Sequence, residues 1–248
     1  MTNVTNRREP KKFEPLFLPN WTPEEAKRFT PFYKDELRKR LYRGEEVNPS
    51  DLGVKEFILK GGRLSGKTKS DEEATVPEIV SPVKGDIWYC RSEDNTIRRS
   101  IFQSMQATLH EFGLTLSNRA DTDFKVTTSP FEIKNNRTGN VIQFFAINKD
   151  INRTKGQYPP SGKLKKVMLE EANEPDGKEY VEALRSTALR FMDENSKFVC
   201  RYNPPPSYTA WANQYYPGRA AKGATLIHST WEDIADLLDP VVIAEILH

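Results

Sequence analysis

Residues 57–68 read Phe-Ile-Leu-Lys-Gly-Gly-Arg-Leu-Ser-Gly-Lys-Thr and match the pattern G-x-x-x-x-G-K-[ST], with Gly61 as the first glycine. The apolar run before the glycines predicts a strand, which is the context that this pattern requires. Glycines allow backbone N–H groups to turn inward around phosphate oxygens, and the N-terminus of the following helix adds partial positive charge. The stretch therefore predicts a phosphate-binding loop, with a purely structural glycine turn as the alternative.

The residues of this loop have different expected roles. Lys67 is expected to reach the β- and γ-phosphates of a nucleotide, and the Thr68 hydroxyl to ligate Mg²⁺. Further nucleotide contacts are expected from Gly61, Gly62, Ser65 and Gly66. The polar run at residues 69–73 predicts that the helix after the loop is short or exposed, because a helix packed under a sheet needs an apolar face.

A second strand is expected to end in carboxylates. Val167-Met-Leu is apolar, and Glu170 and Glu171 follow it directly. A hydrolytic nucleotide site needs carboxylates that hold Mg²⁺ and activate water, so we assign Glu170 to the metal and Glu171 to the attacking water. A solvated acidic turn is the alternative interpretation of this segment.

A third apolar run, Phe198-Val-Cys-Arg-Tyr, ends at Asn203-Pro204. The Asn203 amide could sense the γ-phosphate of a bound nucleotide. Asn-Pro is also an ordinary turn starter, and that alternative stays open.

The rest of the chain alternates strand-like and helix-like segments. Expected strands are 57–59, 86–90, 124–134, 140–147, 167–169, 197–202 and 226–228, with a hairpin turn at 135–139. Expected helices are an apolar stripe at 97–112, a helix capped by Asp176 that includes Phe191, and residues 241–247 after Asp239-Pro240. Strands separated by helices in this way predict an α/β fold with a mainly parallel central sheet and helices on both faces.

Composition narrows the class of protein. The 248 residues carry a formal net charge of +2 and a mean hydropathy of −0.69, without an apolar stretch long enough for a membrane span. The near-neutral charge excludes a strongly basic nucleic-acid coat but leaves a local basic groove open. The charged start of the chain argues against a signal peptide, and Cys90 and Cys200 are expected to be buried thiols in a reducing compartment.

Together these motifs resemble the large terminase subunit of tailed bacteriophages, the ATPase that drives double-stranded DNA into procapsids. The resemblance is carried by Leu59–Thr68 as Walker A, Val167–Glu174 as Walker B, Ile151–Gly156 before Walker B, and Tyr202–Pro205 with Trp211 as the coupling motif. It implies a P-loop NTPase of the additional-strand Glu class that hydrolyses ATP with Mg²⁺. It also implies a host-cytoplasmic motor that contacts double-stranded DNA, the portal protein and the small terminase subunit.

The resemblance assigns roles residue by residue. Lys67, Arg63 and Glu171 would be catalytic, with Arg63 at the γ-phosphate and Glu171 activating water. Glu170 would support the metal, and Asn203 would bind the nucleotide and couple hydrolysis to movement. Arg91 matches a family arginine without an assigned role.

Two departures from the family pattern matter. The usual Walker B aspartate is Glu170 here, and the family's adenine-recognising glutamine has no clear counterpart near Phe29. Family members also continue into a nuclease domain, and this chain stops before it, so we expect no nuclease activity from these residues.

The expected organisation has three parts. Residues 1–48 form a polar N-terminal arm with short helices, 49–230 the P-loop ATPase core, and 231–248 the start of a lid or linker region. The resemblance implies a homo-oligomeric ring in the motor, while the isolated domain could be a monomer.

Two other functions stay open. One is another P-loop nucleic-acid motor such as a helicase, although no room remains for a second core domain. The other is a nucleotide-binding docking module without turnover. A GTPase is disfavoured because Asn148-Lys149-Asp150 places the aspartate one position too early for the guanine-reading motif.

Overall fold

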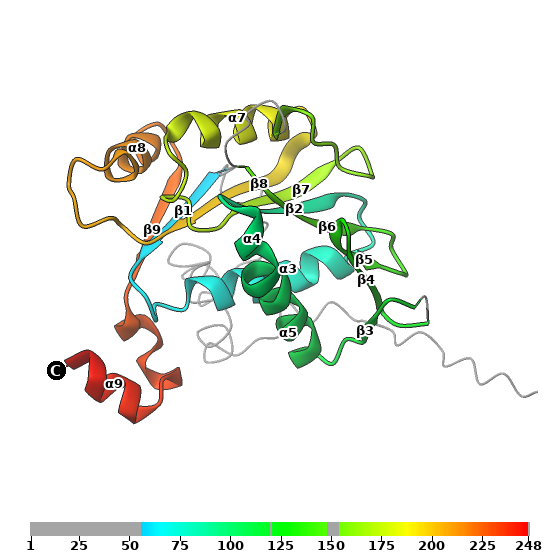
Figure 1. Ribbon diagram of the computed structural model, residues 1–248, viewed down its shortest axis with the longest axis horizontal. Coiled ribbons are helices and arrows are strands. Elements are labelled where there is room, and N and C mark those ends of the chain that lie inside the picture. Colours follow the sequence, from blue (N-terminus) through cyan, green and yellow to red (C-terminus); the bar gives the residue numbers. More distant parts are fainter. Residues whose placement is uncertain (1–55, 120, 148–153, 248) are drawn as a thin grey trace, which may run out of the picture.

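The computed structural model describes residues 56–119, 121–147 and 154–247. Within these ranges one sheet has the strand order β3-β4-β5-β6-β2-β7-β8-β1-β9 (Figure 1). The strands are β1 (Glu56–Gly61), β2 (Asp86–Arg91), β3 (Leu116–Ser117), β4 (Phe124–Thr128), β5 (Phe131–Asn135), β6 (Val141–Ala146), β7 (Leu164–Leu169), β8 (Met192–Tyr202) and β9 (Thr225–Ser229). The helices are α3 (Lys67–Val80), α4 (Asp94–Ile97), the π-helical η2 (Arg98–Phe102), α5 (Gln103–Glu111), α7 (Lys178–Leu189), α8 (Trp211–Ala220), the 3₁₀-helical η3 (Trp231–Leu237) and α9 (Pro240–Leu247).

The central part of the sheet is parallel. Strands β6, β2, β7, β8, β1 and β9 pair in parallel, whereas β5 pairs antiparallel with both β6 and β4. Strand β8 lies between β1, which leads into the glycine-rich loop, and β7, which leads into the paired glutamates. This order brings the ends of three neighbouring strands to one edge of the sheet. Ligands of open α/β sheets bind at that edge.

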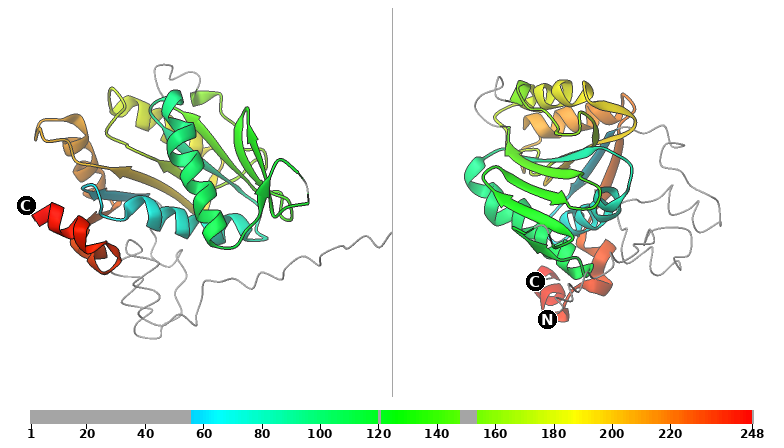
Figure 2. Two further views of the ribbon diagram at one scale, coloured as in Figure 1. Left: turned by 60° about the horizontal axis from the view of Figure 1, so that its bottom comes forward. Right: turned by 90° about the vertical axis from the view of Figure 1, so that its right-hand side faces the viewer.

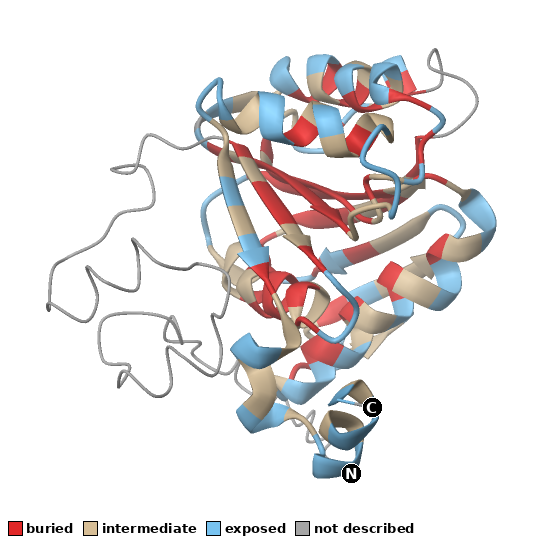
Figure 3. Ribbon diagram, turned by 90° about the vertical axis from the view of Figure 1, so that its left-hand side faces the viewer, coloured by how far each residue is buried: buried red, intermediate tan, exposed pale blue. Residues whose placement is uncertain are grey.

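Helices cover both faces of the sheet, as predicted (Figure 2). Helices α3, η2 and α5 pack on one face, around a core that includes Val76, Ile101 and Met105. Helices α7 and α8 pack on the other face, around Leu184 and Tyr216. Buried residues accordingly concentrate in the strands and on the inner sides of these helices (Figure 3). The predicted α/β fold is confirmed.

The apolar stripe beginning at Ile97 forms α4, η2 and α5 in succession. Ile97, Ile101, Met105 and Leu109 are buried, because residues at this spacing share one side of a helix. The predicted hairpin at residues 135–139 is also present and joins β5 to β6.

The prediction of a single strand over residues 124–134 was wrong. The segment forms two antiparallel strands, β4 and β5, which pair Thr128 with Phe131 across Ser129 and Pro130. Proline has no backbone N–H to donate to a strand ladder, so the chain reverses direction at this point.

The prediction that the helix after the loop is short or exposed was also wrong. Helix α3 has 14 residues, and its polar residues Ser70, Asp71, Glu72 and Glu73 are buried. Asp71 and Glu72 find partners inside the protein, described below, and the second half of the helix packs on the core through Val76 and Ile79.

The helix expected from Asp176 differs at both ends. Gly177 is the N-cap of α7, and no side chain caps it. The helix ends at Leu189, so Phe191 lies beyond it, although Phe191 still packs against the α7 side of the core. Asp239 does cap α9, since the Val241 N–H donates to its Oδ1 at 2.8 Å.

Some expectations lie outside the described residues. These include the N-terminal arm with its short helices, the Phe29 region, the Asn148–Asp150 segment, and the first three residues of the Ile151–Gly156 segment.

Two further sequence expectations can be compared with the described residues. Cys90 on β2 and Cys200 on β8 are free and buried, as expected. Burial raises the pKa of both thiols. None of the described helices is both long enough and apolar enough to cross a membrane.

Candidate nucleotide site

The glycine-rich loop connects β1 to α3 and depends on two glycines. A Cβ on Gly61 would lie 2.2 Å from the Ser229 carbonyl oxygen on β9, so only glycine permits this close approach. Gly66 is the N-cap of α3 and has φ +72°, in the left-handed region that glycine adopts without strain. The loop therefore delivers the N-terminus of a 14-residue helix, with its unpaired N–H groups, to the carboxyl edge of the sheet.

A pocket of about 360 Å³ lies over this loop. Its lining combines the loop, the residues that follow β7 and β8, and one residue of η3. The lining residues are Gly62, Arg63, Leu64, Ser65, Gly66, Lys67, Thr68, Lys69, Glu170, Glu171, Arg201, Tyr202, Asn203 and Ile234. Every predicted site residue lines this pocket except Gly61, whose carbonyl lies beneath it and accepts a hydrogen bond from Lys67.

The Lys67 ammonium is held by several oxygens. It donates to the carbonyls of Gly61 and Gly62, both at 2.7 Å, to Ser65 Oγ at 2.9 Å and to Asn203 Oδ1 at 3.0 Å. Burial, reinforced by the Arg201 charge, lowers the pKa of Lys67 to about 8, while the Glu171 charge opposes this shift. The charged form thus predominates at neutral pH, as phosphate binding requires.

Glu171 follows β7 with an unusual backbone conformation. Its φ of +46° lies in the left-handed region, which a non-glycine residue adopts at a cost of about 1–3 kcal/mol. Its Oε2 accepts a long hydrogen bond of 3.5 Å from Asn203 Nδ2. Asn203 therefore links the loop lysine to this glutamate. Strain of this kind is typical of functional sites.

The pKa of Glu171 is raised above its ordinary value. Burial is the largest cause, and the Glu174 charge adds to it, whereas the charges of Arg91, Lys67 and Arg63 oppose it. A carboxylate with a raised pKa is a better proton acceptor near neutral pH than an ordinary glutamate.

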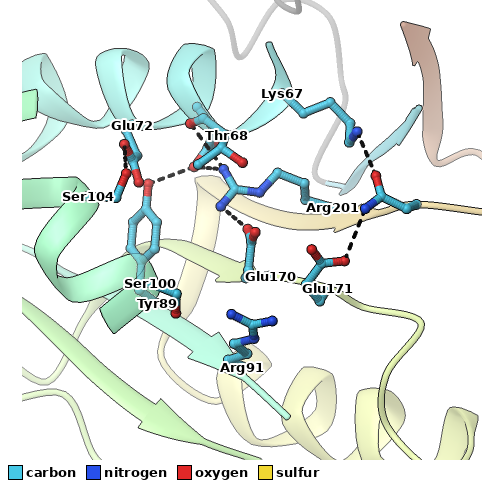
Figure 4. A network of polar contacts seen from close by, with 12 residues as sticks. Lys67, Thr68, Glu72, Tyr89, Arg91, Ser100, Ser104, Glu170, Glu171 and Arg201 are labelled. Atoms are coloured by element: carbon cyan, nitrogen blue, oxygen red, sulfur yellow. Dashed lines mark hydrogen bonds and ion pairs between the residues drawn. The ribbon is translucent and has the colours of Figure 1, made fainter. Parts of the chain in front are cut away.

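Arg91 lies at the end of β2, on the far side of Glu171 from the loop (Figure 4). Its Nη2 and Nε contact both carboxylate oxygens of Glu174, at 3.0 and 3.3 Å. The Arg91 guanidinium is thus fixed near Glu171 by a neighbour on the same loop. Its role stays unassigned by the family resemblance.

Glu170 points toward α3 and forms an ion pair with Arg201 Nη2 (Figure 4). Arg201 Nη1 also donates to the Thr68 carbonyl at 3.1 Å. The two residues predicted to ligate Mg²⁺, Thr68 and Glu170, are therefore joined by one guanidinium group.

Behind this pair lies a buried cluster of charges between α3 and the sheet. Lys166 Nζ binds Asp71 Oδ1 at 2.5 Å, and Tyr89 donates to Asp71 Oδ2 at 2.6 Å. Arg201 Nη1 lies 4.0 Å from the same Oδ2. Glu72, whose pKa burial raises, accepts hydrogen bonds from two residues of α5. This cluster explains why the polar start of α3 can be buried.

The residues after β7 also contact α8. Trp211 Nε1 donates to the Pro175 carbonyl at 3.0 Å, and Tyr216 donates to the Ala172 carbonyl at 2.7 Å. A shift of the loop that carries Glu171 would therefore alter these two hydrogen bonds and move α8.

The donor set fits a nucleotide with Mg²⁺. The helix N-terminus and Lys67 suit phosphate oxygens, and Thr68 and Glu170 supply a hydroxyl and a carboxylate on one side of the pocket. No group of three or more His, Cys, Asp or Glu side chains able to hold a metal occurs in the described ranges. Nucleotide-bound Mg²⁺ needs no such group, because phosphates and water supply most of its ligands.

Five lining residues are not among the predicted site residues: Leu64, Lys69, Arg201, Tyr202 and Ile234. Arg201 was quoted only as part of a strand, although a cation inside an apolar run is a signal of a buried ion pair. Ile234 reaches the pocket from η3, far along the chain, and no local pattern indicates it.

A family model described as "Phage terminase large subunit" matches residues 54–246. The large terminase of a thermophilic bacteriophage superposes with a TM-score of 0.60 at 15% identity, covering 79% of this chain and 45% of that one. The same thermophilic phage protein in complex with ATP-gamma-S gives 0.58 at 15% identity, with 79% and 44% covered.

The large terminase of bacteriophage HK97 gives a TM-score of 0.56 at 10% identity, with 83% of this chain and 42% of that chain covered. At such identities the likeness shows a shared fold. The chain spans less than half the length of these terminases. None of the curated protein sequences matches the chain.

Proposed function

Because this chain belongs to the phage terminase large subunit family, we propose that it is the ATPase domain of a viral DNA-packaging motor. One observation carries the proposal: Lys67, Asn203 and Glu171, from three neighbouring strand ends, form a hydrogen-bonded line across the pocket. A phosphate-binding lysine and a glutamate with a raised pKa at one site support hydrolysis of a nucleoside triphosphate. The large terminase of the thermophilic phage has been solved with ATP-gamma-S and with ADP, which supports ATP as the substrate.

Each site residue has a proposed task. The loop amides, with Gly62, Ser65 and Gly66, hold the phosphates, and Lys67 and Arg63 bind the β- and γ-phosphates. Thr68 and Glu170 would hold Mg²⁺, which neutralises charge on the phosphate oxygens when bound. Glu171 orients the attacking water and accepts its proton.

Asn203 is proposed to couple hydrolysis to movement. It touches both Lys67 and Glu171, and the segment that follows it leads to α8. A change at the γ-phosphate would alter these two hydrogen bonds and, through the contacts of Trp211 and Tyr216, the position of α8.

The wider assignment follows from the family. We propose a homo-oligomeric ring in the host cytoplasm that moves double-stranded DNA into procapsids with the portal protein and the small terminase subunit. Residues 49–230 would form the ATPase core, with 1–48 as an arm and 231–248 as the start of a lid. The position of Ile234 in the pocket lining supports a lid role for η3.

The first test is ATP binding and steady-state hydrolysis with Mg²⁺ by the parent chain and by Lys67→Ala. We expect turnover by the parent, and loss of binding and turnover in the variant because the phosphate charge loses its partner. Binding without turnover in the parent would contradict an ATPase and favour a nucleotide-binding docking module.

DNA contact needs a separate test. Binding of double-stranded DNA should be independent of sequence and weaken steeply with salt, because phosphate contacts release counterions. The slope of log affinity against log salt concentration measures this. A strong sequence preference or a flat slope would count against a packaging motor.

A further inference from the structure

Arg201 occupies a position in the sheet where an apolar residue would be expected. It lies on strand β8, where it pairs with Leu59 of the neighbouring strand β1. The preceding residue, Cys200, pairs with Leu169 at the end of β7, the neighbour on the other side. Val199, two residues earlier on the same face, belongs to the apolar core under α3. The Arg201 side chain is only 2% exposed. A buried guanidinium costs several kcal/mol unless its partners compensate.

Its partners are specific. Nη2 pairs with the Glu170 carboxylate, and Nη1 donates to the Thr68 carbonyl at 3.1 Å (Figure 4). The planar guanidinium has a fixed fork of donors, so these two contacts set the separation of β7's end from the first turn of α3.

The Nη1 end of the guanidinium also lies near a second buried carboxylate. Asp71 Oδ2 lies 4.0 Å from Nη1, and Asp71 is itself held by Lys166 and Tyr89. Arg201 is therefore the last member of a buried chain of charges, and it faces the two candidate Mg²⁺ ligands. An arginine is not needed here to fill the core, because an apolar side chain of similar size packs at a lower cost in free energy.

We propose that Arg201 is a positioning residue that holds Glu170 and the first turn of α3 at the separation required for Mg²⁺ binding. The inference rests on the proposed function, in which Thr68 and Glu170 hold the metal. Partners that orient a metal-binding carboxylate typically matter by 10- to 100-fold in metal affinity. Lysine is a poor replacement for this arginine, because it lacks the two separated nitrogens with which Nη2 reaches Glu170 and Nη1 reaches the Thr68 carbonyl.

The test uses Mn²⁺ as the probe, detected by electron paramagnetic resonance, with the full chain saturated with ADP. In Arg201→Lys we expect Mn²⁺ affinity to fall by about 10- to 100-fold. ADP affinity in EDTA should stay within about twofold, because the loop and Lys67 bind phosphate without the metal.

Arg219→Lys is the matched control. Arg219 pairs with the buried Glu56 at the other end of β1 and does not line the pocket. It should change neither Mn²⁺ nor ADP affinity.

A second variant covers the case in which Arg201→Lys does not fold. Arg201→Gln removes the charge and keeps a donor that can reach only one partner, so it should weaken Mn²⁺ binding similarly. In a Glu170→Gln background, either substitution should lower Mn²⁺ affinity by clearly less than in the parent chain, because Arg201 then acts only through its contact with the first turn of α3.

The outcomes separate the inference from the proposed function. Parental Mn²⁺ affinity in a folded Arg201 variant would overturn the inference alone. An equal loss of Mn²⁺ affinity in Arg219→Lys would also overturn it, because the loss would then not be specific to Arg201. A parent chain that binds ADP but no Mn²⁺, or no ADP at all, would overturn the proposed function and the inference with it.

Discussion

Helices α7 and α3 cover opposite faces of the same parallel strands, but they pack with different chemistry. Helix α7 buries Val181, Leu184 and Ala188 against an apolar cluster. Helix α3 buries Asp71 and Glu72 near its N-terminus, with apolar residues only in its second half. The face under α7 is apolar, as is usual for a sheet covered by helices, whereas the face under the first half of α3 is charged.

The difference follows the position of the site. The buried charges of α3 lie directly behind the phosphate loop and end at the contact of Arg201 with Glu170. Buried ion pairs contribute little net stability compared with apolar packing, so their presence on this face points to a task other than holding the fold. We infer that the α7 face supplies stability and the α3 face positions the site.

The largest expected effect on stability is on the charged face. Lys166→Met removes the closest cation of the buried Asp71 and, among the described residues, leaves only Arg201, at 4.0 Å. Breaking a buried pair in this way costs about 3–5 kcal/mol. Chemical denaturation of the two proteins measures the difference. The control is Lys69→Met, because Lys69 pairs with Glu111 at the surface, where a pair is worth about 0–1 kcal/mol. Equal losses for the two variants would contradict the distinction between the buried and exposed pairs.

On the apolar face, Leu184→Ala should lower the free energy of unfolding by about 2–5 kcal/mol, because a fully buried side chain is truncated. The affinity for ADP should be unchanged, since α7 does not line the pocket. Denaturation and a nucleotide titration are the two measurements. Weakened ADP binding in a folded variant would show that the two faces do not divide stability from function as inferred.

The smallest expected effect is on pH dependence. Glu171 accepts a proton only when deprotonated, so hydrolysis should fall as pH drops through its raised pKa. Arg91→Gln removes a cation that opposes the raised pKa, so the acid limb of kcat/KM should move to higher pH. Glu174→Gln removes an anion that raises it, so the limb should move to lower pH. Shifts in the same direction would contradict this account of the Glu171 environment.

Much of the fold could be predicted from the sequence because apolar runs and helical stripes are local patterns. Strands with both faces covered are nearly continuous apolar runs, which is why β1, β2, β7 and β8 were located. The site motifs were found for a similar reason, since each follows directly on such a strand. The parallel sheet then brings their ends together.

Two of the errors, the exposure of α3 and the omission of Arg201, came from interactions between residues distant in the sequence. The polarity of α3 indicated exposure because its partners Lys166, Tyr89 and Arg201 lie on other strands. Arg201 was missed for the same reason, since its contacts with Glu170 and Thr68 exist only after the sheet forms. The division of residues 124–134 was a local error, because Pro130 marks it in the sequence.

The central claim is that Glu171 is the catalytic carboxylate of an ATPase site. Single-turnover hydrolysis of ATP with Mg²⁺ should be compared in the parent chain, Glu171→Gln and the exposed control Glu182→Gln, with ATP affinity measured for each. We predict that Glu171→Gln keeps parental affinity and loses at least about 100-fold in rate, the usual contribution of a general base, while Glu182→Gln matches the parent. Equal rates in the parent and Glu171→Gln would contradict the claim and require the base to lie elsewhere.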